Sequence, residues 1–172
     1  MILISSYGNL LSNDPMISNG FSITGWLNSW FSLNISGLVV VLTGAAVFLL
    51  PLARLRAYKY FSFRYLTMAS ILLWIIIFNH KAESPTFIIA MTGVALWFIR
   101  GEKNPMNIVL LILALLFVSL SSTDLFPINF RKGFIEPFAI KVFPCILIWM
   151  KIIYDMMLLK IDQSKTKAPL PI

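Results

Sequence analysis

The sequence predicts an all-α membrane protein, a polytopic bundle of about five transmembrane helices with a short interfacial helix near the N-terminus. Hydrophobic residues make up 59% of the 172 residues, and charged residues only 12%. An average soluble domain has about a quarter of its residues charged. The apolar residues are also gathered in runs, which short polar stretches separate. A surface with so few charged groups is expected to face lipid.

The N-terminal segment, residues 1–34, is expected to form an extracytoplasmic loop that contains the interfacial helix. Residues 1–20 are polar and rich in turn-forming residues. A helical spacing of large apolar residues follows, with polar residues between them: Ile23, Trp26, Leu27, Trp30 and Phe31. This stretch is too short and too polar to span a bilayer. It is typical of a helix lying in the interface, where tryptophan is enriched. The alternative is a loop packed against the bundle.

Five apolar runs within residues 35–160 are the candidate transmembrane helices. Two of them have only fifteen residues, about 22 Å of helix, against about 30 Å of hydrocarbon in a bilayer. In the first run, the small residues Gly37, Gly44, Ala45 and Ala46 would let another helix approach closely. A polar cytoplasmic tail, residues 161–172, follows the last run. The five runs are residues 35–53, 65–79, 85–99, 106–120 and 138–159.

Three local patterns refine the helices. Ser84 followed by Pro85 is typical of a helix N-cap and the first helical position. Lys151 and Asp155 are four residues apart, so they share a helix face and are expected to pair. Lys141 lies near the end of its predicted helix, where a long side chain can reach toward the membrane surface.

The distribution of charge predicts both the partners and the orientation of the chain. The net charge is +7, and most basic residues lie between apolar runs, where anionic lipid head groups account for them better than nucleic acid does. The excess of Lys and Arg in alternate loops places the N-terminus outside and the C-terminus in the cytoplasm. The loops assigned to the cytoplasm contain Arg54, Arg56, Lys59, Arg64, Arg100, Lys103, Lys160, Lys165 and Lys167.

Metal and cofactor chemistry finds little support in the sequence. One histidine, His80, and one cysteine, Cys145, cannot build a zinc site, and a lone cysteine cannot form an intrachain disulfide. The sequence also has no glycine-rich phosphate loop and no GxSxG motif. We therefore expect no metal and no cofactor.

The strongest candidate for chemistry is the polar linker between the second and third runs. His80, Lys81 and Glu83 place three titratable groups within four positions, next to Ser84. Ionisable groups at membrane depth are costly and tend to be functional. His80, Lys81 and Ser84 could bind a phosphate, and Glu83 could orient one of them or act as a base. The alternative is an ordinary polar turn that closes a helical hairpin.

A second candidate lies in the polar loop before the last apolar run. Arg131 and Lys132 could hold an anionic lipid head group. They could equally belong to a solvated loop. The sequence leaves both interpretations open.

The linker carries a resemblance to a known family. The stretch NHKAESPT (79–86), followed by Ile88-Ile89-Ala90, Gly93-Val94-Ala95 and Trp97, resembles a region near the C-terminal end of bacterial glycosyltransferase family 87 proteins. Residues 6–14 and the stretch from Gly25 to Phe31 are also similar to those proteins. The resemblance covers most of the chain, and the NHKAESPT stretch is its most specific part.

The resemblance implies a polytopic GT-C enzyme of the bacterial inner (cytoplasmic) membrane. Such enzymes transfer a sugar, often mannose, from a polyprenyl-phosphate carrier to an acceptor at the outer face. The chemistry requires a carboxylate base for the acceptor hydroxyl and basic groups near the leaving phosphate. His80 and Lys81 match the type of residue expected near that phosphate.

The chain also departs from the family. GT-C enzymes have many more helices, and their catalytic aspartate lies in the first outer loop, a context that Asp14 does not match. We therefore expect the C-terminal portion of such an enzyme, which would need the missing N-terminal helices and would be inactive alone. One alternative is a non-enzymatic membrane accessory subunit of envelope-polymer assembly. A transporter subunit is a further alternative.

Overall fold

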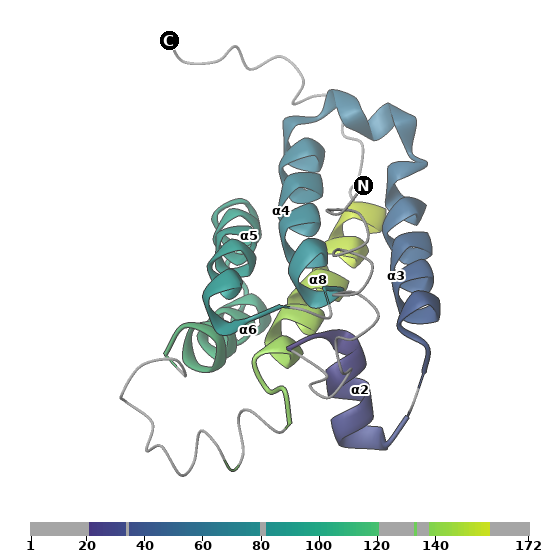
Figure 1. The fold of residues 1–172 in the computed structure, drawn as a ribbon. Helices are drawn as coiled ribbons and strands as arrows, with labels where there is room; N and C mark the ends of the chain where they lie inside the picture. The colour runs from purple at the N-terminus through teal and green to yellow at the C-terminus, as the bar shows by residue number, and fades with distance from the viewer. Residues whose placement is uncertain (1–20, 34, 80–81, 121–132, 134–137, 159–172) are drawn as a thin grey trace, which may run out of the picture.

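The structure, a computed structural model, describes residues 21–33, 35–79, 82–120, 133 and 138–158. These residues form helices and their connections, so the chain is helical as the composition predicts. Each of the five apolar runs, and the short N-terminal stretch, contains an α-helix (Figure 1). The helix bounds lie close to those of the runs, except that α6 ends at Ala114 whereas its run extends to residue 120. The helices are α2 (Ile23–Phe31), α3 (Gly37–Leu52), α4 (Phe61–Ile77), α5 (Phe87–Arg100), α6 (Pro105–Ala114) and α8 (Val142–Leu158).

The prediction of five transmembrane helices is wrong. Among the residues that the structure describes, no helix has both the length and the apolar character needed to cross a membrane. The assignments to a multi-pass inner-membrane protein, with its N-terminus outside and its C-terminus cytoplasmic, are wrong with it. The physical reason is length, because the longest helices, α4 and α8, have 17 residues each. Such a helix is about 25 Å long, less than the hydrocarbon thickness of about 30 Å.

Turns end the helices before they reach a greater length. The 3₁₀ turn η1 (Leu55–Lys59) separates α3 from α4, and the 3₁₀ turn η2 (Ser84–Thr86) precedes α5. A π-helical turn, η3 (Leu115–Ser119), continues α6. The polar and charged residues of η1 and η2 lie at the boundaries of the predicted runs, whereas η3 is largely apolar, so the composition of the fourth run does not register that turn.

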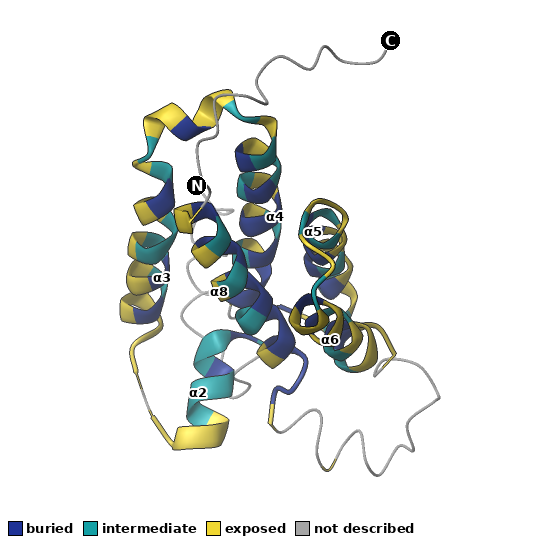
Figure 2. Ribbon diagram, turned by 180° about the vertical axis from the view of Figure 1, so that it is seen from behind, coloured by how far each residue is buried: buried dark blue, intermediate teal, exposed yellow. Residues whose placement is uncertain are grey.

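Helices α4, α5 and α8 enclose most of the buried side chains (Figure 2). Helices α4 and α5 run antiparallel and pack at short range because Gly93 has no side chain. A Cβ atom at Gly93 would lie 2.9 Å from the carbonyl oxygen of Ala69 and 3.3 Å from Cγ of Leu73. The core that these helices share includes Phe63, Leu73, Ile77, Phe87, Trp97, Ile148 and Ile152.

Helix α3 joins this core through a second glycine. A Cβ atom at Gly44 would lie 2.1 Å from Cζ of Phe78, so the phenyl ring occupies the space that a side chain would take. Phe78 in turn contacts Trp74 of α4 and Trp149 of α8, each with 5.4 Å between ring centroids. The close approach predicted at Gly44 is confirmed, and its partner is an aromatic ring.

The antiparallel arrangement gathers different segments at the two ends of the bundle. At one end Arg54, just after α3, donates from Nη1 to the carbonyl oxygens of Met156 and Met157 at the end of α8, over 2.7 and 2.6 Å. The end of α5 meets the start of α4 there, through Arg100 and Ser62. Helix α2, the turn η2 and the start of α8 lie at the opposite end (Figure 1).

Candidate functional site

Helix α2 packs against the start of α8, next to the candidate site. Its N-cap, Ser22, accepts a hydrogen bond from the backbone N–H of Gly25 over 3.3 Å. The Trp26 ring stacks on Phe143 of α8 with 5.9 Å between centroids, and Nε1 of Trp30 donates to the carbonyl oxygen of Phe138 over 2.9 Å. The predicted helix therefore exists, and these contacts hold it against the start of α8.

Lys141, immediately before α8, is the central charged group of the site. Only 2% of the residue is exposed. Its ammonium donates a hydrogen bond to the hydroxyl of Ser84 and lies 5.2 Å from the centroid of the Phe21 ring. A buried cation is costly unless hydrogen bonds or aromatic faces compensate it. Ser84 and Phe21 provide these two kinds of contact.

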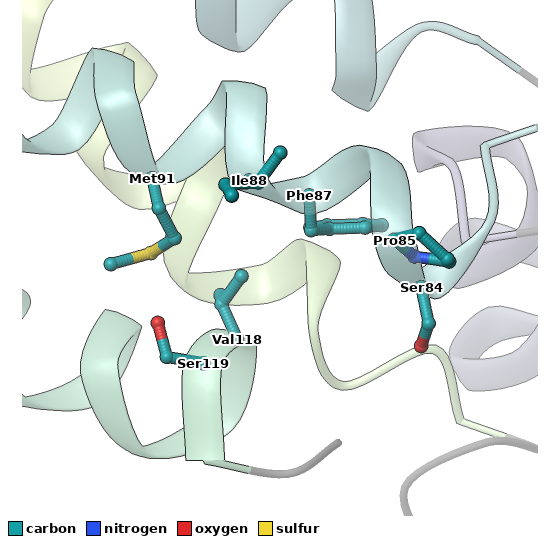
Figure 3. Close-up of a pocket in the computed structure, with 7 residues that line it drawn as sticks. All are labelled: Ser84, Pro85, Phe87, Ile88, Met91, Val118 and Ser119. Atoms are coloured by element: carbon teal, nitrogen blue, oxygen red, sulfur yellow. The ribbon is translucent and has the colours of Figure 1, made fainter. Parts of the chain in front are cut away.

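Ser84 lies at one end of a small pocket between α5 and η3 (Figure 3). The pocket has a volume of about 250 Å³. Met91 and Ser119 lie at its other end, and the Ser119 hydroxyl points toward Met91 (Figure 3). Between the two serines the walls are largely apolar, and Lys141 reaches the pocket only through its hydrogen bond to Ser84. The lining residues are Ser84, Pro85, Phe87, Ile88, Met91, Val118 and Ser119.

The local fold of η2 turns Ser84 toward Lys141 and away from the helix. Thr86 donates to the carbonyl oxygen of Glu83 from both Oγ1, over 2.7 Å, and its backbone nitrogen, over 3.0 Å. These bonds close the 3₁₀ turn, and α5 begins after it at Phe87. The predicted N-cap at Ser84 is therefore wrong, because this turn precedes the α-helix and the Ser84 hydroxyl accepts from Lys141 instead.

The structure brings together only part of the predicted site. Ser84 belongs to it, and the exposed Glu83 is its neighbour in the chain. His80 and Lys81 lie outside the described residues, as do Arg131 and Lys132.

Lys141 is the residue whose role the sequence reasoning missed. Its side chain was expected to extend toward a membrane surface, and it is buried instead. Ser84 and Lys141 are 57 residues apart in the chain. No local spacing connects them, so the sequence carries no signal for the pair.

The ion pair of Lys151 with Asp155 and the buried Cys145 thiol have structural roles rather than chemical ones. Lys151 and Asp155 form the predicted i, i+4 ion pair on α8, which is confirmed. Burial raises the pKa of the Cys145 thiol from 9.0 to about 12, so the thiolate needed for nucleophilic attack is scarce at neutral pH. Within the described residues, no group of three or more His, Cys, Asp and Glu side chains could hold a metal ion.

Comparison with known proteins adds no relative to these observations. No protein-family model, curated protein or solved structure matches the chain.

Proposed function

We propose that this protein binds the phosphate of a polyprenyl-phosphate-linked sugar at Lys141 and Ser84, and takes part in transferring that sugar to an acceptor. The observation that carries the proposal is the buried ammonium of Lys141, which donates to Ser84, a residue that also lines one end of a largely apolar pocket. A lipid phosphate has the same two parts, one anionic and one apolar. The resemblance to glycosyltransferase family 87 supports the class of substrate.

The proposed chemistry uses the cation to stabilise the leaving group. When the bond between the sugar C1 and the phosphate oxygen breaks, the phosphate leaves with the electron pair and gains negative charge. Lys141 would stabilise that charge, and its burial would strengthen the interaction relative to an exposed lysine. Ser84 would help, since its hydroxyl can donate to phosphate while it accepts from the ammonium.

The acceptor hydroxyl must lose its proton as its oxygen bonds to C1. Glu83 is one residue from Ser84 and exposed, so it is the carboxylate we propose to orient the acceptor or take this proton. His80 and Lys81, four and three residues before Ser84 in the chain, are proposed to add positive charge near the phosphate. The proposal requires no metal, because the donor is a lipid phosphate.

The pocket would take the part of the carrier next to the phosphate. Phe87, Ile88, Met91 and Val118 give its walls an apolar surface. Sites for drug-sized ligands usually have about 300–1,000 Å³, and this pocket is smaller, at about 250 Å³. We therefore propose that it holds the first isoprene units and leaves the rest of the chain outside.

The test is the binding of farnesyl phosphate, a short analogue of the carrier, to the full chain. Lys141→Met should weaken binding about 10- to 100-fold, the value of a hydrogen bond to a charged group. Ser84→Ala should weaken it less, and Lys141→Arg should restore part of it, because both leave a cation in place. Lys151→Met is the matched control, since Lys151 is a lysine of α8 paired with Asp155.

The result has to separate binding from folding. Farnesol, which lacks the phosphate, should bind wild type and Lys141→Met equally if the pocket is intact. Equal binding of farnesyl phosphate to wild type, Lys141→Met and Ser84→Ala would refute the phosphate site. The chain alone is expected to be inactive, so transfer of radiolabelled mannose from polyprenyl-phosphate mannose is to be measured with a complex isolated with the chain.

A non-enzymatic accessory subunit is the second candidate function. The observation that favours it is the exposure of large apolar side chains on α3, such as Leu38, Leu42 and Leu49 (Figure 2). Exposed apolar patches mark surfaces that bind other molecules. Binding of farnesyl phosphate without sugar transfer, by the chain and by any complex isolated with it, would favour this role.

A further inference from the structure

We propose that one end of the helical bundle docks on an anionic lipid surface. The basic surface, as we define it, lies at the end of the bundle opposite Ser84. Its cations come from three segments: the residues between α3 and α4, the first turn of α4, and the residues from the end of α5 to the start of α6. The proposal does not rest on the sugar-transfer function. The basic surface consists of Arg54, Arg56, Lys59, Arg64, Arg100 and Lys103.

Contacts with Phe61 join the segments of the basic surface. The guanidinium of Arg100, at the end of α5, lies 5.2 Å from the centroid of the Phe61 ring, and that of Arg64 lies 5.7 Å from it. Arg100 also donates from Nη2 to Oγ of Ser62 over 3.4 Å. Arg64 and Arg100 are 36 positions apart in the chain, and both guanidinium groups lie over the Phe61 ring.

The basic surface has little acidic charge of its own. Residues 54–64 contain no Asp or Glu, and Glu102 is the one acidic residue in 98–106. All of its cations are exposed except Arg54, which is half-buried where it caps the end of α8. Like charges held this close favour an anionic partner, because the partner relieves their repulsion.

Exposed apolar side chains lie among the cations and indicate which anionic partner fits. Leu55 is 78% exposed, Ile99 68% and Phe61 52%. A lipid surface offers anionic head groups to the cations and an apolar layer just beneath to the aliphatic side chains. Nucleic acid offers no apolar layer, and proteins bind its single strands mainly by stacking aromatic rings on the bases.

A shallow depression beside η1 gives the head group a place to sit. Ala53, Arg54, Leu55 and Arg56 line it, and its volume is about 350 Å³. Arg56, which is exposed on this lining, can offer paired N–H donors to phosphate oxygens, a geometry that arginine favours. Arg54 adds positive charge beside it, while its Nη1 donates to the end of α8. Leu55 would then enter the apolar layer beside the bound head group.

The experiment compares binding of the full chain to two kinds of vesicle. One is pure phosphatidylcholine, and the other is an equal mixture of phosphatidylcholine and phosphatidylglycerol. The exposed apolar side chains contribute to both, so the ratio of the two affinities isolates the charge. We expect Arg56→Gln combined with Lys59→Gln to lower that ratio about 30-fold, since each cation near such a surface contributes about 1 kcal/mol. Added salt should lower the wild-type ratio.

A matched variant shows whether position or net charge matters. Lys165→Gln combined with Lys167→Gln removes the same charge from another segment, and we expect it to lower the ratio by less than the first pair. Equal losses from both pairs, or a wild-type ratio near one, would overturn the proposal. Tighter binding of a single-stranded oligonucleotide than of the mixed vesicles, lost in the first pair, would also overturn it.

Lys141→Met separates this inference from the proposed function. It should leave the vesicle ratio unchanged, because Lys141 lies at the other end of the bundle. The Arg56/Lys59 pair should likewise leave binding of farnesyl phosphate unchanged. If Lys141→Met lowers the vesicle ratio as much as the Arg56/Lys59 pair does, docking does not belong to the basic surface.

Discussion

Individual residues set how closely the helices approach one another. Gly93 lets α4 and α5 meet, and Gly44 accepts the ring of Phe78. The two positions differ in what a side chain would meet. At Gly44 the obstacle is a ring at the end of a side chain, which can turn, whereas at Gly93 it includes the backbone carbonyl of Ala69. Gly93 is therefore the less tolerant position.

Gly93→Ala should lower the free energy of unfolding by about 1–3 kcal/mol, the usual cost of overpacking a core. Alanine is the better helix former, by about 1 kcal/mol, so a net loss of stability would reflect the contact with Ala69. Gly37→Ala is the matched control, since the nearest atom, Cγ2 of Thr24, is 4.0 Å from the added Cβ. Denaturant unfolding measures both, and equal stability of the two variants would contradict this account.

At the scale of elements, α2 depends on its partner more than on its own sequence. It has nine residues, and isolated helices shorter than about 12–15 residues are marginal in water. Its N-cap and its tryptophan contacts with the start of α8 compensate for this shortness. The prediction that residues 23–31 form a helix was correct because the period of the large side chains is local.

Trp26→Ala should release α2 from α8 while α4 and α5 keep their packing. The change removes the stacked contact with Phe143, and aromatic pairs contribute about 0.5–1.5 kcal/mol beyond their buried area. Hydrogen exchange should therefore speed up in α2 amides and change little in α4. Trp30→Phe, which loses only the hydrogen bond to Phe138, should have a smaller effect. Faster exchange throughout α4 would instead show that the helices unfold together.

At the scale of the whole molecule, the antiparallel helices separate two chemically different ends. Ser84 lies just before α5 and Arg100 at its end. The fourteen residues of α5 cover about 21 Å. Substitutions at the proposed phosphate site and at the basic surface should therefore act independently of each other.

Stability of the whole fold should decrease in alkaline solution because of Cys145. Its thiol pKa is about 12 in the folded chain against 9.0 in the reference state, since burial disfavours the thiolate. Above pH 9 the unfolded chain loses this proton while the folded chain keeps it, so deprotonation favours unfolding. The contribution is fully present below pH 9 and is lost as the pH rises toward 12.

Denaturant unfolding at several alkaline pH values would measure this dependence. Cys145→Ala removes the thiol, so it should be less stable at neutral pH but show a shallower decline above pH 9. An equally steep decline in that variant would assign the pH dependence to other groups.

The sequence by itself determined the helical class, the positions of the helices and the Lys151–Asp155 pair. All three follow from the period or spacing of neighbouring residues, which a helix turns directly into geometry. The sequence misled us about membrane spans, because the apolar composition of a run does not make its helix long enough to cross a bilayer, and no α-helix here exceeds 17 residues within the described part of the chain.

Only the tertiary structure decided which distant groups meet. It brought Lys141 to Ser84 and Phe21, and Arg100 to Phe61. Such pairs depend on how whole helices pack. Ser84 and Lys141 are 57 positions apart, so the spacing of neighbouring residues does not predict their contact. Burying the ammonium of Lys141 is costly unless it finds a hydrogen-bond acceptor. The Ser84 hydroxyl is such an acceptor, and it does not serve as the N-cap that its sequence position predicted.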